Sequence, residues 1–237
     1  MKSPSLEGAS QKKENLPAEK DLAPIVQERY EMMLMMKEVK EALALLDKLP
    51  DELGLVYHVK DHTLDVIHDT VLFAVADNVT PDVLKQQSIA AAWHDMGFLT
   101  RLDDNESLAV DAFQQSEAFK RMSRTAVWET IANIWDTRVL KEDGALRLTM
   151  KESTIGYVLD GDVSNFGRPD FFEKMNAVAK ERKLDLTNPA VKKAFLTDVI
   201  SLLENHEWRT EPARRFREAT KQENLEKLRS EYAMLVD

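Results

Sequence analysis

Glycine and proline are scarce in this chain. The 7 glycines and 8 prolines make up 15 of 237 residues, about half of the roughly 12% that average usage gives. Residues that interrupt helices are therefore far apart, while alanine, leucine, lysine, glutamate and methionine, which favour helices, are plentiful. No alternation of apolar and polar residues typical of a strand is longer than four residues. We therefore predict an all-α fold.

The apolar residues recur at spacings of three, four and seven, which predicts eight to nine helices. Thr80 and Pro81 are typical of a helix start, and we expect Gly97 to end that helix. Residues 141–148 are expected to form a turn-rich connection. The predicted helices cover residues 22–48, 56–77, 80–97, 105–120, 123–137, 150–162, 170–183, 188–206 and 211–235.

Residues 1–20 differ in composition from the rest of the chain. This segment is polar and lacks the apolar run of a secretory signal, so we expect a flexible tail. Residues 21–237 then form a single helical domain, for which 43% hydrophobic residues are sufficient. No apolar run approaches the roughly 20 residues that span a bilayer. We expect a cytoplasmic protein without a membrane partner.

Charge and the lack of cysteine exclude several classes of function. The 32 basic and 42 acidic residues give a net charge of −10, which argues against binding of a nucleic acid polymer. With no cysteine, disulfides, thiolate metal sites and cysteine nucleophiles are excluded. The 5 histidines are the scarce reactive side chains.

Two histidines and two aspartates are candidates for a metal site. His62 lies on a polar stripe of its predicted helix, and His94 with Asp95 falls in the last turn of the next, where backbone carbonyls favour a cation. Asp162 extends an apolar stripe, and a carboxylate directed toward a core must be paired or bound to metal. Two imidazoles and two carboxylates suit one divalent ion, such as manganese, iron, zinc, nickel or magnesium.

Three stretches carry a resemblance to a known family: YHVKDHTLDVI at 57–67, IAAAWHDMGF at 89–98 and GYVLDGDVSNFG at 156–167. In this order they resemble the HD-domain superfamily of metal-dependent phosphohydrolases. The likeness spans residues 22–232, and its C-terminal part resembles an uncharacterised bacterial branch. The resemblance implies an HD-domain-like helical bundle. It also implies metal ligands at His62, His94, Asp95 and Asp162, and hydrolysis of the phosphate ester of a nucleotide or another small phosphorylated metabolite.

Other residues are candidates for the steps of such a reaction. Asp95 could accept a proton from the attacking water, and Asp103 or Glu106 could protonate the leaving oxygen. The alternative is that Asp103 is a solvated acid in a loop and that Glu106 is an acidic residue in the first turn of a helix. His58 is a candidate for holding the substrate phosphate or orienting a ligand. Arg168 is a candidate phosphate clamp, or else a surface arginine at a helix end.

The chain also departs from the family pattern. Many relatives carry Lys or Glu just behind the His-Asp doublet, where this chain has Met96, Gly97 and Phe98. This departure motivates an alternative: a non-catalytic module that binds a nucleotide or metabolite. The extra histidines of dinuclear relatives are missing between the doublet and Asp162, so a single ion is expected. If the chain forms a homodimer, we expect the contact on its methionine-rich first helix.

Overall fold

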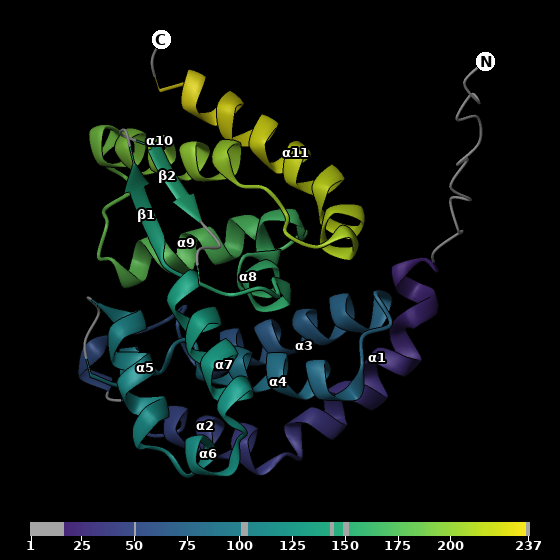
Figure 1. The fold of residues 1–237 in the computed structure, drawn as a ribbon. Coiled ribbons are helices and arrows are strands. Elements are labelled where there is room, and N and C mark those ends of the chain that lie inside the picture. The colour runs from purple at the N-terminus through teal and green to yellow at the C-terminus, as the bar shows by residue number, and fades with distance from the viewer. Residues whose placement is uncertain (1–16, 50, 101–103, 143–144, 149–151, 236–237) are drawn as a thin grey trace, which may run out of the picture.

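A computed structural model describes residues 17–49, 51–100, 104–142, 145–148 and 152–235. Within these residues the fold is an all-α bundle, as predicted (Figure 1). None of their helices combines the length and apolar character that a membrane span requires. The helices are α1 (Glu19–Leu34), α2 (Lys37–Leu46), α3 (Lys60–Ala76), α4 (Pro81–Trp93), α5 (Asn105–Gln115), α6 (Glu117–Arg121), α7 (Arg124–Asp136), α8 (Tyr157–Asp162), α9 (Phe171–Glu181), α10 (Pro189–Asn205) and α11 (Glu211–Ala233).

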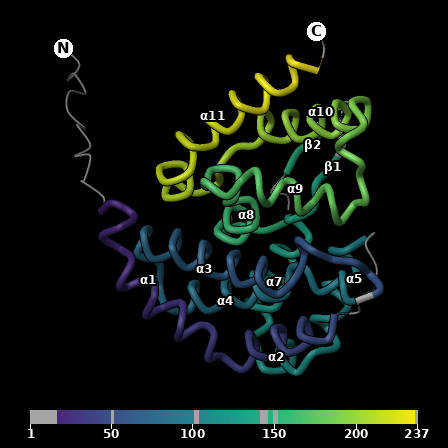
Figure 2. Tube along the Cα trace, turned by 180° about the vertical axis from the view of Figure 1, so that it is seen from behind, coloured from purple at the N-terminus to yellow at the C-terminus, as the bar shows by residue number. Residues whose placement is uncertain are grey.

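The helices form two layers, which Figures 1 and 2 show from opposite sides. One layer holds α1 to α7, and the other holds α8 to α11 with a small hairpin. Helix α3 lies where the layers meet, because it contacts α1 and α4 on one side and α8 on the other. Its side chains Ile67, Val71 and Phe73 are fully buried. The core thus runs through the same helix that holds His62 in its first turn.

Several helices start where the sequence provides a capping side chain. Thr80 accepts a hydrogen bond from the backbone N–H of Val83 with Pro81 at the first helical position, as predicted. Ser116, Ser123 and Thr210 cap α6, α7 and α11 in the same way. The predicted end at Gly97 is wrong, because α4 ends at Trp93 and Gly97 lies in the short 3-10 helix η2 (Met96–Leu99).

Two predicted helices are each divided in the structure. The prediction over 22–48 becomes α1 and α2, with extended backbone at Met36 between them. The direction changes because α1 packs on α3 whereas α2 packs on α4. The prediction over 105–120 becomes α5 and α6, which separate at the capping residue Ser116.

The segment between α7 and α8 also differs from the prediction. Strands β1 (Val139–Glu142) and β2 (Ala145–Leu148) form an antiparallel hairpin with Val139 opposite Leu148. Helix α8 begins only at Tyr157, although apolar spacing predicted a helix from residue 150. The backbone N–H groups of residues 152–155 donate instead to the carboxylates of Asp136 and Glu129 on α7. These long-range bonds replace the first turns of the predicted helix.

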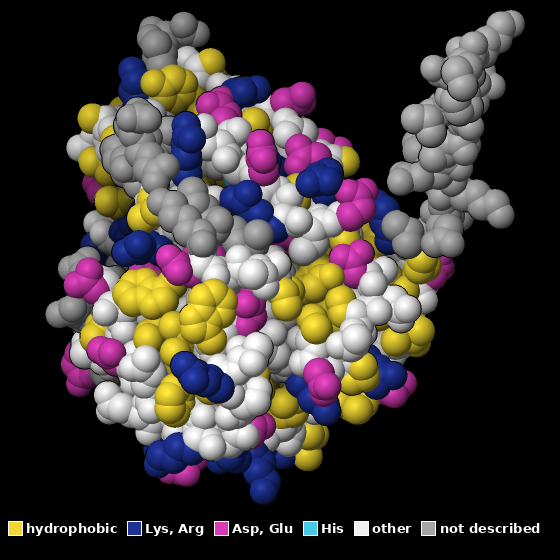
Figure 3. Space-filling model, in the orientation of Figure 1, with side chains coloured by type: hydrophobic (Ala, Val, Ile, Leu, Met, Phe, Trp, Pro, Cys, Tyr) yellow, Lys and Arg dark blue, Asp and Glu magenta, His cyan; other side chains and the backbone are white. Residues whose placement is uncertain are grey.

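Hydrophobic side chains gather in the middle of the face drawn in Figure 3, beside α7 in the orientation of Figure 1. On α7, Trp128 is 55% exposed and borders a groove that Ile131 and Trp135 also line. No histidine side chain is visible on this face. The two candidate imidazole ligands, His62 and His94, are buried.

Candidate metal centre

Helix α3 supplies the first imidazole of the site. His62 lies in the first turn of α3 and is 4% exposed. His58 was predicted on the same helix, but α3 starts at Lys60, so His58 belongs to the segment before it. The two rings still lie edge to face, with their centroids 5.7 Å apart. Tyr57 packs against the His62 imidazole, and the centroids of these two rings are 4.5 Å apart.

The end of α4 supplies an imidazole and a carboxylate. His94 is fully buried, and its Nδ1 lies 2.7 Å from the backbone carbonyl oxygen of Ala91. Because a carbonyl only accepts, Nδ1 carries the proton and donates, which leaves Nε2 as the ligand atom. Asp95 is 6% exposed, and its Oδ1 accepts a hydrogen bond of 3.0 Å from the side-chain amide of Asn105. This bond leaves Oδ2 of Asp95 directed to the imidazoles.

Close backbone contact explains the glycine behind this doublet. A Cβ atom at Gly97 would lie 2.0 Å from the backbone oxygen of Asn105 and 2.6 Å from its Oδ1. Only glycine therefore lets the start of α5 approach η2 so closely. The contact brings Asn105 to Asp95.

Helix α8 supplies the second carboxylate from the other layer. Asp162 is the last residue of α8, which packs along α3. A Cβ atom at the preceding Gly161 would lie 2.6 Å from Oγ1 of Thr70 and 3.0 Å from the backbone oxygen of Val66. The glycine therefore permits the approach of α8 to α3 that brings Asp162 to His62.

The four predicted ligand side chains meet at one place. Nε2 of His62 lies 3.2 Å from Oδ1 of Asp162 and 3.4 Å from Oδ2 of Asp95. Nε2 of His94 lies 3.4 Å from the same Asp162 oxygen and 3.1 Å from the same Asp95 oxygen. Ligand atoms of His62, His94 and Asp162 all lie within 4.8 Å of one another, and Asp95 does not belong to this group.

The separations between the imidazole nitrogens and the carboxylate oxygens fit a single ion. Two ligand atoms about 2.1 Å from a shared ion are about 3.0 Å apart at a right angle and about 3.4 Å apart at the tetrahedral angle. Nε2 of His94 and Oδ2 of Asp95 are buried without a hydrogen-bond partner in the described part of the chain. A buried polar atom needs a partner, and a cation at this point would provide one for both. The two imidazoles and two carboxylates also match the donors that divalent transition metals accept.

The charges of the cluster are strongly coupled. Burial alone would raise the pKa of Asp162, but the hydrogen bond with His62 and the attraction of His62 and His94 hold it well below its ordinary value. Burial would lower the pKa of His94, but the two carboxylates raise it well above its ordinary value. The carboxylates therefore require positive charge at this point, which either a protonated imidazole or a metal ion can supply.

His58 is held by a carboxylate that the sequence analysis did not select. Nδ1 of His58 contacts Oε1 of Glu181, the last residue of α9. Oε2 of Glu181 accepts the backbone N–H groups of Val56, Tyr57 and His58 at 2.9 to 3.1 Å. Burial would lower the pKa of His58, but this carboxylate raises it above its ordinary value. No local pattern marks Glu181, which follows His58 by 123 residues.

The predicted proton donors have different outcomes. Asp103 lies outside the described residues. Glu106 lies in the first turn of α5, directly after Asn105, and burial raises its pKa. The charges of Asp95 and Asp162 raise it further. Asn105 itself was missed, although its position at the start of the helix behind the doublet is a usable signal.

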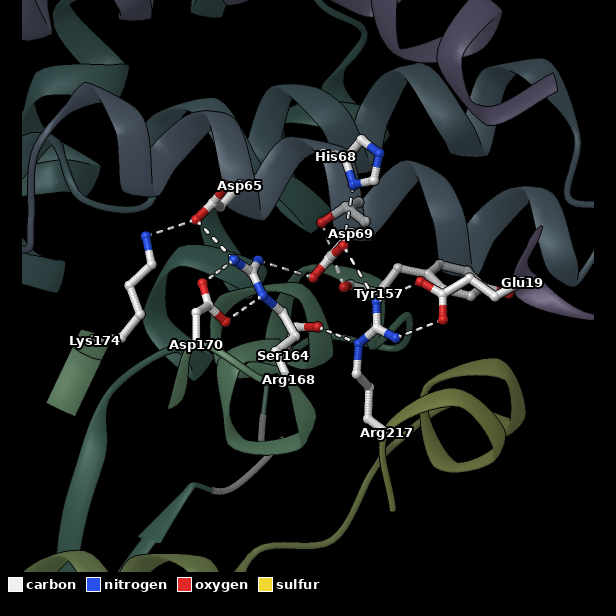
Figure 4. Close-up of polar contacts among 11 residues, drawn as sticks. Glu19, Asp65, His68, Asp69, Tyr157, Ser164, Arg168, Asp170, Lys174 and Arg217 are labelled. Atoms are coloured by element: carbon white, nitrogen blue, oxygen red, sulfur yellow. Dashed lines mark hydrogen bonds and ion pairs between the residues drawn. The ribbon is translucent and has the colours of Figure 1, made fainter. Parts of the chain in front are cut away.

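Arg168 does not join the cluster. Figure 4 shows its guanidinium surrounded by the carboxylates of Asp65, Asp69 and Asp170. Nearby, Arg217 forms a pair of hydrogen bonds with Glu19 at 2.8 and 3.0 Å and contacts Asp69. This network joins four parts of the fold: α1, α3, α11, and η3 (Ser164–Gly167) together with the residues that follow it. The charge of Arg168 is therefore already neutralised inside the fold, which speaks against the predicted phosphate clamp.

Compared with protein-family models, with curated proteins and with solved structures, the chain matches none of them.

Proposed function

We propose that this protein is a metal-dependent phosphohydrolase that cleaves the phosphate ester of a small substrate. One observation carries the proposal: Nε2 of two buried histidines and carboxylate oxygens of two aspartates converge at 3.1 to 3.4 Å. The sequence order of His62, the His94–Asp95 doublet and Asp162 supports the assignment, because it resembles the HD-domain superfamily. The net charge of −10 favours a small substrate over a nucleic acid.

His62, His94, Asp95 and Asp162 would hold one divalent ion. Such an ion polarises a phosphoryl oxygen and lowers the pKa of a bound water. Asn105 fixes one oxygen of Asp95 and so aims the other at the site, where it can accept a proton.

Two further groups suit the phosphate and the leaving oxygen. Glu181 fixes Nδ1 of His58 and raises its pKa, so that a protonated ring can donate from Nε2 to a phosphoryl oxygen. Glu106, whose pKa is raised, retains a proton at higher pH than an ordinary glutamate and is suited to protonate the leaving oxygen.

A binding module without turnover is the second candidate. It is favoured by the residues behind the doublet, because Met96, Gly97 and Phe98 are buried and carry no ionisable group. A lysine or glutamate there would hold phosphate or transfer a proton in many relatives. The fold and the ion could therefore be retained while catalysis is lost.

Elemental analysis and a phosphate-release assay distinguish the two candidates. The protein is purified without chelator, its metal content is measured, and it is incubated with sugar phosphates, alkyl phosphates and nucleotides. We expect about one divalent ion per chain and release of inorganic phosphate. One ion without any phosphate release would favour the binding module, and a chain that retains no ion would contradict the metal-dependent phosphohydrolase.

A further inference from the structure

A cavity of about 180 Å³ lies directly beside the cluster. Asp162, His58 and Tyr57 form the wall that it shares with the proposed metal centre. Arg182 and Asp198 also line the cavity, and both are exposed, so they mark its opening to solvent. A molecule with its phosphate at the cluster would therefore extend its remaining part into this space.

Two helices contribute apolar stripes to this cavity. Their residues lie at positions i, i+4 and i+7, so each set occupies one face of its helix. Phe171 and Phe195 are 2% and 6% exposed and form the inner surface. The stripes are Phe171, Met175 and Val178 on α9, and Phe195, Val199 and Leu202 on α10.

The cavity is small and apolar, which limits its ligand. A cavity of about 150 Å³ lined by apolar side chains holds benzene, whereas drug-sized ligands occupy pockets of about 300 Å³ or more. A nucleoside is therefore too large for this space. Besides Tyr57, His58 and Asp162, the polar residues that line the cavity are Asn165, Arg182 and Asp198. A sugar that lies against the two apolar stripes would leave the hydroxyl groups on that side without partners, which is unfavourable.

We infer that this cavity binds a small apolar group, one aromatic ring or a short alkyl chain, carried by a phosphate ester. The inference rests on the proposed function for the phosphate, but the fit of the apolar group rests on the cavity alone. It narrows the substrate to the phosphate ester of a small apolar alcohol or phenol.

Two measurements test the inference on the full chain. In the first, hydrolysis of hexyl phosphate is compared with hydrolysis of glycerol 3-phosphate, because both have an alkoxide leaving group. We expect kcat/KM to be at least tenfold higher for hexyl phosphate. In the second, binding of 4-fluorobenzyl alcohol is followed by fluorine NMR in the presence of chelator, so that neither metal nor turnover is required.

Filling the cavity links both measurements to this site. Val199→Trp places a large ring in the cavity from α10, and we expect at least a tenfold loss of alcohol binding and of kcat/KM for hexyl phosphate. Ala194→Trp adds the same ring at an exposed position of α10 that does not line the cavity, and should leave both unchanged. If Val199→Trp loses helix content, Val178→Trp fills the cavity from α9 instead.

The outcomes separate the inference from the proposed function. Phosphate release with no preference for hexyl phosphate, together with no alcohol binding, would overturn the inference and leave the proposed function intact. Alcohol binding that Val199→Trp removes, with no phosphate release from any ester, would overturn the proposed function and support the apolar site. Alcohol binding that neither cavity-filling variant weakens would also overturn the inference.

Discussion

The carboxylate of Glu181 at the end of α9 holds the ring of His58 in front of α3, 123 residues earlier in the chain. The same side chain accepts three consecutive backbone N–H groups of residues 56–58. One acid therefore fixes both the imidazole and the backbone that leads to His62. This arrangement joins the two layers of the bundle beside the proposed metal centre.

Replacing this acid by its amide tests the arrangement. Glu181→Gln keeps the shape of the side chain but removes its charge. We therefore expect the free energy of unfolding to fall by about 1–3 kcal/mol, the range for hydrogen bonds to a charged group. The pKa of His58 should fall, because the carboxylate that raises it is gone. Urea unfolding and NMR titration of the ring measure the two effects. Glu173→Gln, at an exposed position of α9, is the control, and equal effects of both variants would contradict the assignment.

The pair also predicts how stability depends on pH. The pKa of Glu181 is lowered to about 2, because the hydrogen bond from His58 outweighs burial; its contribution is therefore complete above about 4.5 and decreases as the pH falls toward 2. The pKa of His58 is raised, so its contribution is complete below about 6.5 and decreases as the pH rises beyond that value. We expect the pair to stabilise most between about pH 4.5 and 6.5. Urea midpoints measured from below about pH 4.5 to above about pH 6.5 should vary less in Glu181→Gln than in the parent protein.

Removing one proposed ligand should remove the ion. Asp95→Ala deletes one of two carboxylates at the cluster, so we expect metal content to fall at least tenfold and hydrolysis to be lost. Helix content measured by circular dichroism should remain. Asp82→Ala at the start of α4 is the control, since that side chain is 97% exposed. Unchanged metal content in Asp95→Ala would refute the ligand assignment.

The close approach of α8 to α3 makes a separate prediction. Gly161→Ala forces a Cβ atom to within 2.6 Å of Oγ1 of Thr70, so α8 must shift and carry Asp162 away from His62. We expect a loss of about 1–3 kcal/mol in stability and weaker metal binding by calorimetry. Thr70→Ala in the same chain removes the nearest atom and should restore part of the affinity, although the carbonyl of Val66 at 3.0 Å remains. Unaltered metal affinity in Gly161→Ala would show that the spacing is not required.

Arg168 should matter for folding. Burial would raise the pKa of Asp69, but a hydrogen bond from His68 and the charges of Arg217 and Arg168 keep it below its ordinary value. Arg168→Ala removes one of these charges, and we expect a loss of about 1–3 kcal/mol in unfolding free energy. If the variant keeps full stability but has a raised KM for the phosphate ester, this result would instead support the role of phosphate clamp that the sequence predicted for Arg168.

The sequence predicted the helical class and the positions that converge. Scarce glycine and proline and the regular apolar spacing are properties of single segments, so they could be interpreted without knowledge of packing. The side chains of His62, His94, Asp95 and Asp162 also lie together, as expected from their positions on predicted helices and from the resemblance carried by three stretches of sequence. Whether they bind metal stays a prediction.

The errors come from contacts between distant segments. The bonds from residues 152–155 to Glu129 and Asp136 delay the start of α8, and no periodicity within 150–162 reveals them. Glu181 and the partners of Arg168 were missed for the same reason. In the sequence, a charged residue on a helix that faces solvent cannot be told apart from one that contacts a histidine.

The contribution of α8 to the metal centre also has a consequence for synthesis. Asp162 follows Asp95 by 67 residues, which corresponds to roughly 3 to 13 seconds of translation at about 5–20 residues per second. A nascent chain that has already exposed both imidazoles therefore has only three of the four proposed donors until α8 leaves the ribosome. Binding of the proposed ion by all four donors would thus require α8 to be synthesised and packed on α3.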